Sequence, residues 1–260
     1  MRVISLNANG VRAAARRGFF EWAQSENADI VCLQETRAQE RERSPEAIVL
    51  PGSHAYYVDA QRRGYSGVAL YSRWEPRSIR RSLGWEDMDS EGRFVQADFG
   101  EFTVSSLYVP SGITGPERQS YKMAFLERLL AVLARMRHGG GRHIVCGDLN
   151  IAHKSIDTYS PGRNAVVSGF LPEERDWMNA LIEQVGWTDA FRAVNRQSRQ
   201  YTWWSNRPGA WERNLGWRID YQLVTPNLAA RIRGAAIYTT SRFSDHAPLT
   251  VDYDLSDFGY

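Results

Sequence analysis

Acidic, amide and imidazole side chains gather at the ends of short apolar runs in this 260-residue sequence. The residues concerned are Asn7, Glu35, Asp148, Asn150, Asp220, Asp245 and His246. Asp148 and Asn150 flank the apolar Leu149, so both would point to one face of an extended chain. Such a set suits a phosphodiesterase that uses a hard cation, because it supplies oxygen ligands for Mg²⁺, a base for water and a group that binds phosphate.

Each of these residues also has an ordinary structural explanation. Asp or Asn after a strand usually caps a helix or forms an Asx turn, and a lone histidine is usually structural. Two features favour a site: the shared face of Asp148 and Asn150, and the position of Asp245-His246 between a serine and Ala-Pro. Cysteines and histidines show no zinc-ligand spacing. The two cysteines lie inside apolar runs, which predicts buried thiols and fits a reducing, cytoplasmic compartment.

The predicted elements that would position these residues run evenly along the chain. Runs rich in Val, Ile and Tyr predict strands at 2–6, 29–34, 67–71, 94–99, 102–109, 143–147, 219–224 and 249–253. Helical periodicity predicts helices at 11–25, 117–137 and 172–185. The glycine triplet at 139–141 is interpreted as a C-cap and loop, because a phosphate-binding loop would need a following helix. No linker interrupts the pattern, so we expect one mixed α/β domain over residues 1–260.

Composition narrows the class of protein. Apolar residues make up 43% and charged residues 24%, which is ordinary for a soluble globular protein. No signal-peptide pattern and no apolar stretch of about 18 residues is present, so we expect no membrane contact. The net charge of +2 decides little. Nine Trp and twelve Tyr residues, several of them near the C-terminus, would suit stacking on nucleic-acid bases.

Nine short motifs occur in a set order over nearly the whole chain. They are Asn7 with QET (34–36), GYSGVA (64–69), EGR (91–93), LYVP (107–110), GDLNIAH (147–153), GFLPEER (169–175), YTWW (201–204), GWRIDY (216–221) and SDHAP (244–248). The ordered set resembles the exonuclease III / AP endonuclease family of DNA repair nucleases. The resemblance implies an α/β fold, a four-layer αββα sandwich in which two packed mixed β-sheets are flanked by helices and carry the site at one rim.

The resemblance also implies a metal site made of oxygen ligands. Glu35 would be the principal ligand, with Asn7 and Asp245 nearby and with Asp148 and Asn150 completing the set. Mg²⁺ is the expected cofactor, and Mn²⁺ would serve in its place.

Roles in catalysis follow from the same resemblance. Asp148 would orient and deprotonate the attacking water, while Asn150 and Tyr108 would hold the phosphate. His246, partnered by Asp220, would donate to the scissile phosphate, since an Asp–His pair keeps an imidazole oriented and protonated. These roles agree with the chemistry, because phosphodiester cleavage depends on positioning and charge neutralisation.

Six further residues match positions at which the family contacts DNA. They are Tyr65, Arg93, Asn164, Trp203, Trp217 and Ile219. Tyr65 and Arg93 would equally suit ordinary loops, and tryptophans are usually core residues. Polar residues between Trp203 and Trp217 predict a surface loop, which favours an apolar pocket for a base-less sugar or a 3′ end.

The implied partner is double-stranded DNA with nicks, 3′ blocks or abasic sites, bound by a monomer. The implied activity is that of a 3′→5′ exodeoxyribonuclease and 3′-phosphodiesterase, accompanied by apurinic/apyrimidinic endonuclease activity. The chain departs from strong AP endonucleases at Ser111-Gly112-Ile113, where relatives carry Asn or Gln and an Arg nearby. Beside Asn164, Val166 and Val167 stand where animal-type enzymes carry asparagines. These departures predict that 3′-end trimming outpaces abasic incision.

Two rival hypotheses stay open. The chain also resembles the catabolite repression control proteins, RNA-associated regulators of the same fold that have lost catalytic residues. Such a regulator has no need to keep the set Glu35, Asp148, Asn150, Asp220 and Asp245, and all five are present here. A phosphodiesterase with a lipid or small substrate, such as a sphingomyelinase or an inositol phosphatase, accounts less well for the YTWW and GWRIDY motifs.

Overall fold

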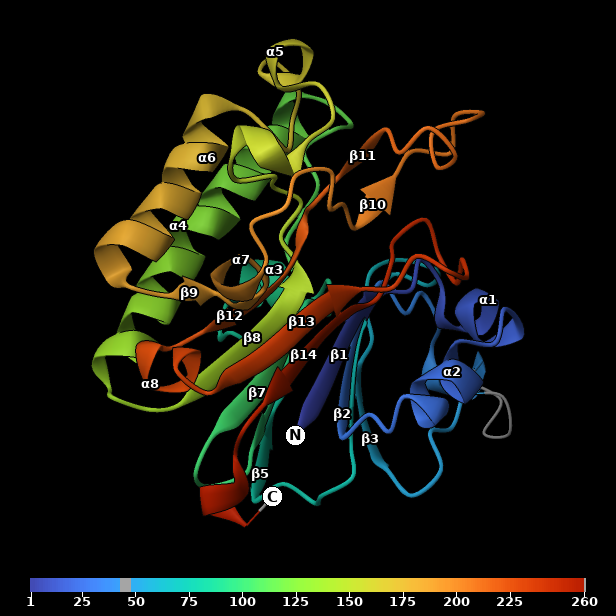
Figure 1. The fold of residues 1–260 in the computed structure, drawn as a ribbon, viewed down its shortest axis with the longest axis vertical. Coiled ribbons are helices and arrows are strands. Elements are labelled where there is room, and N and C mark those ends of the chain that lie inside the picture. The colour runs from blue at the N-terminus through green and yellow to red at the C-terminus, as the bar shows by residue number, and fades with distance from the viewer. Residues whose placement is uncertain (43–47, 260) are drawn as a thin grey trace.

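Runs of Val, Ile, Leu and Tyr form two six-stranded sheets that pack face to face (Figure 1). The computed structural model describes residues 1–42 and 48–259. Val3 and Ile30 of one sheet and Val104 and Cys146 of the other belong to the core between the sheets. Burial of apolar surface contributes roughly 25 cal/mol per Å², and it drives this packing.

The first sheet has the strand order β13-β14-β1-β2-β4-β3. Its strands are β1 (Arg2–Asn7), β2 (Ile30–Gln34), β3 (His54–Val58), β4 (Val68–Ser72), β13 (Ile232–Ile237) and β14 (Leu249–Tyr253). β1 and β2 are parallel, and the other neighbours are antiparallel. The outer face is covered by α1 (Val11–Arg16) and α2 (Phe19–Ser25), where Phe20 packs on Tyr71.

The second sheet has the strand order β5-β6-β7-β8-β12-β9. Its strands are β5 (Ser78–Arg80), β6 (Phe94–Asp98), β7 (Thr103–Tyr108), β8 (His143–Asp148), β9 (Thr188–Asp189) and β12 (Asp220–Val224). β7 and β8 are its parallel pair. The long helix α4 (Pro116–His138) and α6 (Pro172–Asn179) cover its outer face, through residues such as Leu126, Leu133 and Trp177.

Shorter elements complete the fold. A two-stranded hairpin of β10 (Trp203–Trp204) and β11 (Gly216–Trp217) stands apart from both sheets. The short α-helices are α3 (Glu86–Asp89), α5 (Pro161–Asn164), α7 (Ala190–Val194) and α8 (Pro226–Ala229). Single 3₁₀ turns span Glu40–Glu42, Ser155–Asp157 and Ser256–Phe258, and a π-helix spans Ala180–Val185.

The predicted αββα sandwich is confirmed, and all eight predicted strands are present with bounds within one residue of the prediction. β13 and the very short strands β5, β9, β10 and β11 were not predicted, nor was β3. β13 contains Gly-Ala-Ala and an irregular register between Ile232 and Gly234, which weakens its sequence pattern. Cys32 and Cys146 are free and buried, as predicted.

Two of the predicted helices differ from the structure. The helix predicted at 11–25 is two helices, because Gly18 adopts a left-handed conformation with φ 82° between α1 and α2. The helix predicted at 172–185 ends as an α-helix at Asn179 and continues as the π-helix. The third prediction is confirmed, since α4 ends at His138 and the glycine triplet leads directly into β8. Among the residues described, no helix has the length and apolar character needed to cross a membrane.

Candidate active site

The parallel strand pairs of the two sheets end at one rim of the sandwich. In the first sheet Asn7 ends β1 and Glu35 follows β2. In the second sheet Tyr108 ends β7 opposite Asp148, the last residue of β8. β12 is antiparallel to β8 and therefore begins at this rim, with Asp220 opposite Asp148. The topology thus brings together residues that are more than a hundred positions apart in sequence.

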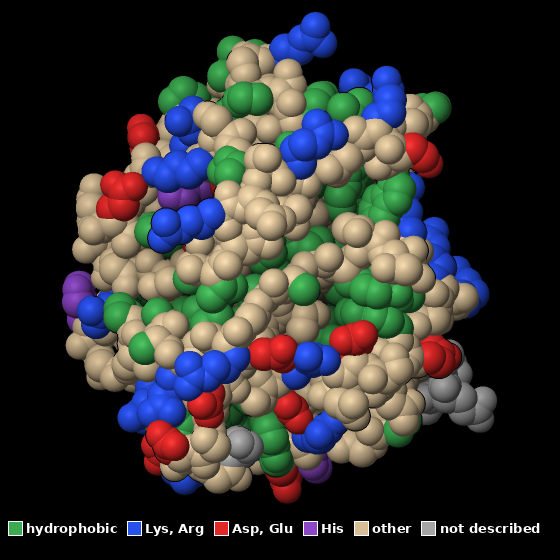
Figure 2. Space-filling view, viewed as in Figure 1, with side chains coloured by type: hydrophobic (Ala, Val, Ile, Leu, Met, Phe, Trp, Pro, Cys, Tyr) green, Lys and Arg blue, Asp and Glu red, His purple; other side chains and the backbone are tan. Residues whose placement is uncertain are grey.

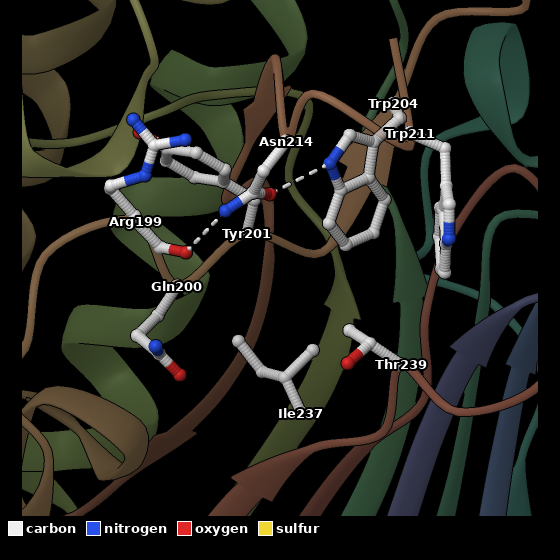
Figure 3. A pocket seen from close by; sticks show the side chains of 8 residues that line it. All are labelled: Arg199, Gln200, Tyr201, Trp204, Trp211, Asn214, Ile237 and Thr239. Atoms are coloured by element: carbon white, nitrogen blue, oxygen red, sulfur yellow. Dashed lines mark hydrogen bonds between the residues drawn. The ribbon is translucent and has the colours of Figure 1, made fainter. Parts of the chain in front are cut away.

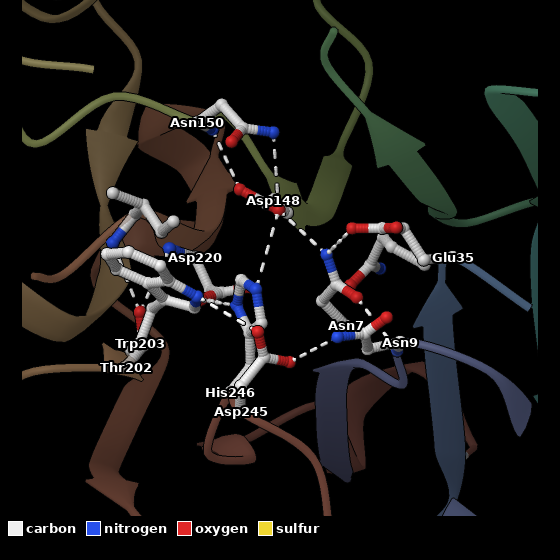
Figure 4. Close-up of polar contacts among 12 residues, drawn as sticks. Asn7, Asn9, Glu35, Asp148, Asn150, Thr202, Trp203, Asp220, Asp245 and His246 are labelled. Carbon is white, nitrogen blue, oxygen red and sulfur yellow. Dashed lines mark hydrogen bonds and ion pairs between the residues drawn. The ribbon is translucent and has the colours of Figure 1, made fainter. Parts of the chain in front are cut away.

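Asp148 lies at the centre of the cluster (Figure 4). Its Oδ2 accepts a hydrogen bond from Asn7 Nδ2 at 2.8 Å, and the same amide group donates to Glu35 Oε1 at 2.8 Å. Asp148 Oδ1 accepts the backbone N–H of Asn150 at 2.8 Å, and Asn150 Nδ2 donates to Asp148 Oδ2 at 3.3 Å. The two residues do lie together, but Asn150 has φ 52°, so a turn and not an extended chain brings them to one place.

His246 lies between two carboxylates. Its Nδ1 is 2.9 Å from Asp220 Oδ2, and its Nε2 is 3.9 Å from Asp148 Oδ2. Burial by itself lowers the pKa of His246, but the charge and the hydrogen bond of Asp220 outweigh it and raise the pKa to about 10. The predicted Asp220–His246 pair is therefore formed, and it keeps the imidazole oriented and charged at neutral pH.

The carboxyl group of Asp148 is also strongly perturbed by its surroundings. Burial raises the pKa of its carboxyl group, and the neighbouring charges of Asp220 and Glu35 raise it further, to about 7, against the opposing charge of His246. A carboxylate held in this way is poised for proton transfer near neutral pH.

The donor set fits a divalent cation. Asp148, Asp220 and His246 offer potential ligand atoms that all lie within 4.8 Å of one another. Asp220 Oδ1 is buried and has no hydrogen-bond partner in the described chain. Glu35 and Asp245 add two more carboxylates at the same pocket. Clustered carboxylates repel one another, so an oxygen-rich site of this kind is stabilised by a hard cation.

Two residues at the rim were not predicted. Asn9 Nδ2 donates to Asp245 Oδ1 at 2.8 Å, and Arg37 forms an ion pair with Glu35. Asn9 stands two residues after Asn7, the same spacing as Asp148 and Asn150, and this spacing could have identified it. No comparable pattern marks Arg37. It belongs to the site only because its guanidinium pairs with the Glu35 carboxylate.

A pocket of about 470 Å³ opens beside these groups. Its polar wall includes Tyr108, Asp148 and Asp245, and its apolar wall includes Trp203 and Ile219. The remaining predicted pocket residue, Trp217, packs edge-on to Trp203 with ring centres 6.5 Å apart. Trp203 Nε1 also donates to Asp245 Oδ2 at 3.2 Å, so the apolar wall is tied to the acidic cluster. The three predicted apolar residues therefore do line a pocket.

The other three predicted DNA-binding residues have different positions. Asn164 lines the pocket but is largely buried, and its Nδ2 donates to Thr158 Oγ1 at 2.6 Å. Arg93 is only 3% exposed and, like Tyr65, is absent from the pocket lining found among the described residues. Arg93 Nη2 donates to the Tyr65 hydroxyl at 3.0 Å, and its guanidinium lies over the ring of Tyr108. The structure thus places Arg93 beside Tyr108 and away from the open surface.

Basic side chains are exposed on two segments that each contribute to the pocket lining. Figure 2 shows Lys and Arg side chains over α5 and over the loop between β10 and β11. Arg163 on α5 and Arg207 and Arg213 in the loop are exposed, and Arg207 lines the pocket. The predicted surface loop between Trp203 and Trp217 is therefore confirmed, and it adds positive charge where a phosphate backbone would approach.

A second pocket, of about 290 Å³, lies at the same hairpin (Figure 3). Trp204 and Trp211 line it, with ring centres 4.3 Å apart. Trp204 Nε1 donates to Asn214 Oδ1 at 3.0 Å, and Asn214 Nδ2 donates to the Arg199 carbonyl at 3.0 Å. These bonds tie the surface loop to the hairpin and so hold the neighbouring Trp203 at the catalytic pocket.

Two buried ion pairs support the pocket from within the fold. Lys122 Nζ of α4 donates to Glu174 at 2.5 Å and to the Asn150 carbonyl at 2.8 Å. Arg218, between Trp217 and Ile219, pairs with Asp157 at 2.8 Å. All four charged side chains are fully or almost fully buried. Sequence patterns did not reveal these pairs, because their partners are 52 and 61 residues apart.

Comparisons with known proteins agree with this geometry. Residues 4–246 match the model of the endonuclease/exonuclease/phosphatase family. An exodeoxyribonuclease of Bacillus subtilis is 38% identical over 96% of this chain and 98% of that protein, and the DNA repair nuclease APEX1 of Danio rerio is 34% identical over 96% of this chain and 81% of that protein.

Solved structures show the same relationship. An AP endonuclease from Archaeoglobus fulgidus superposes with a TM-score of 0.89 at 30% identity, over 98% of this chain and all of that one. The 3′-5′ exonuclease NExo from Neisseria meningitidis superposes with a TM-score of 0.88 at 27% identity, over the same shares of the two chains. With the family model spanning nearly the whole chain and with the acidic cluster at the rim of the sandwich, this protein belongs to the endonuclease/exonuclease/phosphatase family.

Proposed function

We propose that this protein is a Mg²⁺-dependent DNA repair phosphodiesterase that removes nucleotides and blocking groups from 3′ ends and incises abasic sites more slowly. One observation carries the proposal: carboxylates from both sheets, a charged Asp220–His246 pair and an apolar aromatic wall meet at a single pocket. Relatives with this architecture are named as exodeoxyribonucleases and AP endonucleases, which supports DNA as the substrate. A structure of NExo named as a 3′ phosphatase holds a product DNA hairpin.

The residues that would hold the metal ion are Asn7, Glu35, Asp148, Asn150 and Asp245. Asp148 also belongs to the buried group Asp148, Asp220 and His246. A charged His246 that is hydrogen-bonded to Asp220 offers no lone pair to an ion, so we assign the ion to the carboxylates on the Glu35 side. Mg²⁺ prefers such oxygen ligands, and when bound it supplies neutralisation of phosphate charge. A site for a soft metal would need thiolate ligands. Both cysteines are instead buried in the core between the sheets.

The remaining groups position the substrate and move protons. Asp148 accepts a proton from the attacking water, for which a pKa near 7 suits it. His246 donates a hydrogen bond to a phosphate oxygen from its Nε2, because its Nδ1 is occupied by Asp220. Tyr108 and the Asn150 side chain face the same pocket and bind the other phosphate oxygens.

The aromatic wall selects the nucleotide that enters. Trp203, Trp217 and Ile219 form an apolar surface on which a base-less sugar or a frayed 3′ nucleotide can pack. Ser111 and Ile113 also line the pocket, and the Ile113 side chain is 67% exposed. Neither residue can pair with a phosphate as an arginine would. Few contacts are therefore available to hold a flipped lesion in a continuous duplex. A free 3′ end needs fewer such contacts, because it does not have to be flipped out of the duplex.

A gel assay of the purified protein tests the proposal directly. Three duplexes would be compared, one with a nick, one with a 3′-phosphate and one with an internal abasic site, each in Mg²⁺ and in EDTA. We expect cleavage of all three in Mg²⁺, fastest at the 3′ ends, and none in EDTA. The Asp148→Asn variant is the control for contaminating nucleases.

Full activity in EDTA would contradict the metal-dependent mechanism. No activity on any of the three duplexes, together with tight binding of RNA, would favour a regulator of the catabolite repression control type.

A further inference from the structure

A cluster of arginine, tyrosine and glutamate side chains lies next to Tyr108, outside the lining of the catalytic pocket. Its members are Tyr65, Glu91, Arg93, Arg118 and Tyr121, which come from three separate segments of the chain. Tyr108 joins this cluster to the pocket, because its backbone binds Arg93 and its side chain lines the pocket wall.

Each nitrogen of the Arg93 guanidinium donates a hydrogen bond to a neighbour. Its Nε donates to Glu91 Oε2 at 2.6 Å, its Nη1 to the Tyr108 carbonyl at 3.1 Å and its Nη2 to the Tyr65 hydroxyl at 3.0 Å. The guanidinium carbon lies 4.6 Å from the centre of the Tyr108 ring. The backbone N–H of Tyr108 also donates to the Arg93 carbonyl at 2.9 Å. Each part of Arg93 therefore contacts Tyr108 or a group that holds Arg93 against it.

Glu91 anchors this arrangement. Its carboxylate accepts hydrogen bonds from Arg93, from two nitrogens of Arg118 and from the hydroxyl groups of Tyr65 and Tyr121. Burial would raise the pKa of Glu91, but the two arginines lower it to about 2. Glu91 therefore stays charged in the working pH range, and Arg93 cannot leave it without depriving a partly buried carboxylate of one of its two arginine partners.

We propose that Arg93, held by Glu91, is a positioning residue that acts through Tyr108 and does not itself bind DNA. The role rests on the proposed phosphodiesterase function. The Arg93 guanidinium stacks on the Tyr108 ring and binds the Tyr108 carbonyl. These two contacts together fix the orientation and the position of the Tyr108 side chain in the pocket. A positive charge over the ring also makes the phenol a stronger hydrogen-bond donor to a negatively charged phosphate. A group that contacts DNA would need an exposed surface, and Arg93 is only 3% exposed.

Two measurements separate positioning from DNA contact. The first compares kcat and KM of the single variants Arg93→Met and Tyr108→Phe and of the double variant on a nicked duplex. We expect Arg93→Met to lower kcat by about 10- to 100-fold with little change in KM, since a misplacement of about 1 Å has this effect. The double variant should be no slower than the slower single variant, because the two residues act as one unit.

The second measurement is the salt dependence of DNA binding, made in the inactive Asp148→Asn background. Each phosphate contact contributes about 0.9 to the slope of log K against log salt concentration. We expect Arg93→Met to leave the slope and the Kd at one salt concentration unchanged. A slope reduced by about one would overturn the proposal, as would losses of Arg93→Met and Tyr108→Phe that multiply in the double variant.

Arg128→Met is the matched control. Arg128 is also stacked on an aromatic ring, 4.7 Å from the centre of Trp85, and pairs with Asp87, but it lies away from the pocket. Its replacement should leave kcat unchanged. If Arg93→Met does not fold, Glu91→Gln is the alternative, because it weakens the same anchor without removing the guanidinium. It should lower kcat by a smaller factor, and this loss should disappear in the Tyr108→Phe background. A loss that persists in that background would overturn the proposal.

The outcome also distinguishes this role from the proposed function. A wild-type protein with no nuclease activity would refute the proposed function, and with it any role of Arg93 in catalysis. An active wild type whose kcat is unaffected by Arg93→Met would refute only the positioning role.

Discussion

Two of the buried charge clusters in this molecule differ in how well their charges are balanced. At the hairpin, Asp157 is 2.8 Å from Arg218 and 2.7 Å from Arg192, and Arg218 is also 2.8 Å from Asp189. Two arginines thus neutralise two aspartates. At the rim, Asp148 shares a pocket with Glu35 and Asp245 and lies opposite Asp220. Among the described residues, the cations paired with these carboxylates are His246 and the exposed Arg37.

The difference appears in two aspartates that are equally buried. Asp148 and Asp157 are each 1% exposed. Burial raises the pKa of both, but Arg218 and Arg192 lower the pKa of Asp157 to about 2, whereas Asp220 and Glu35 raise that of Asp148 to about 7. Burial alone therefore does not determine the charge of a carboxyl group. A cluster that keeps a net negative charge can bind a cation from solution, and one of its carboxylates can accept a proton during the reaction.

The largest expected effect is that of Asp148→Asn. We expect kcat on a nicked duplex to fall by at least about 1,000-fold, because a group that moves the proton and orients the water is lost. The melting temperature in metal-free buffer should not fall, since the substitution removes one of several like charges. Thermal denaturation and single-turnover kinetics on the same preparation would check both. A large drop in melting temperature would mean that the rim cluster is balanced after all.

Asp157→Asn should have the opposite pattern. We expect a loss of about 3 kcal/mol in the free energy of unfolding, because the buried Arg218 loses one of its two carboxylate partners, while kcat of the folded fraction changes little. Urea denaturation and active-site-normalised kinetics would measure the two quantities. A loss in kcat with unchanged stability would contradict the supporting role of this cluster.

The same pair predicts a pH dependence of stability. The pKa of Asp157 in the folded protein, about 2, lies below the value of about 3.9 expected in the unfolded chain. Its contribution is therefore present above about pH 4 and is lost as the pH falls through about 2. Urea denaturation at pH 5, 4 and 3 should show a shallower decline for Asp157→Asn than for the wild type. Parallel declines would exclude Asp157 as a source of acid sensitivity.

A smaller effect tests whether Asp220 and His246 act together. Asp220→Asn and His246→Gln should each lower kcat by roughly 100-fold, and the double variant should be only slightly slower, because groups that act as a unit are non-additive. Steady-state kinetics of the three variants on one 3′-blocked duplex gives the comparison. Losses that multiply in the double variant would show that the two residues contribute separately.

The smallest expected effect concerns the substrate. We expect kcat/KM for a matched nicked duplex to exceed that for an internal abasic duplex by about 5- to 10-fold, since each absent polar contact costs on the order of 1 kcal/mol during nucleotide flipping. Ile113→Arg should narrow the ratio, as it adds a cation at the pocket wall. Val194→Arg, at another exposed apolar side chain that does not line this pocket, is the control. Faster cleavage of the abasic duplex by the wild type would refute the preference.

Local sequence patterns were enough to determine much of this protein. The buried strands read as continuous apolar runs, so eight of them were predicted within one residue. The polar residues that follow those runs were predicted as one site. Asp148, Asn150, Asp245 and His246 line one pocket, and Asp220 is hydrogen-bonded to His246. Such predictions succeed because strand ends and side-chain chemistry are properties of a few consecutive residues, and because the ordered motifs indicated the family.

Tertiary structure decided what the neighbours do to each side chain. The sequence marks Arg93 as a cation, but only the fold shows that Glu91 and Tyr108 occupy it. Likewise, nothing local distinguishes Asp148 from Asp157, whose carboxyl groups the fold places among carboxylates and among arginines, respectively. Most of these contacts join residues that are far apart in sequence, such as Asn7 and Asp148 or Asp157 and Arg218. Coulombic energies change steeply over a few ångströms, so they become defined only once the sheets have packed.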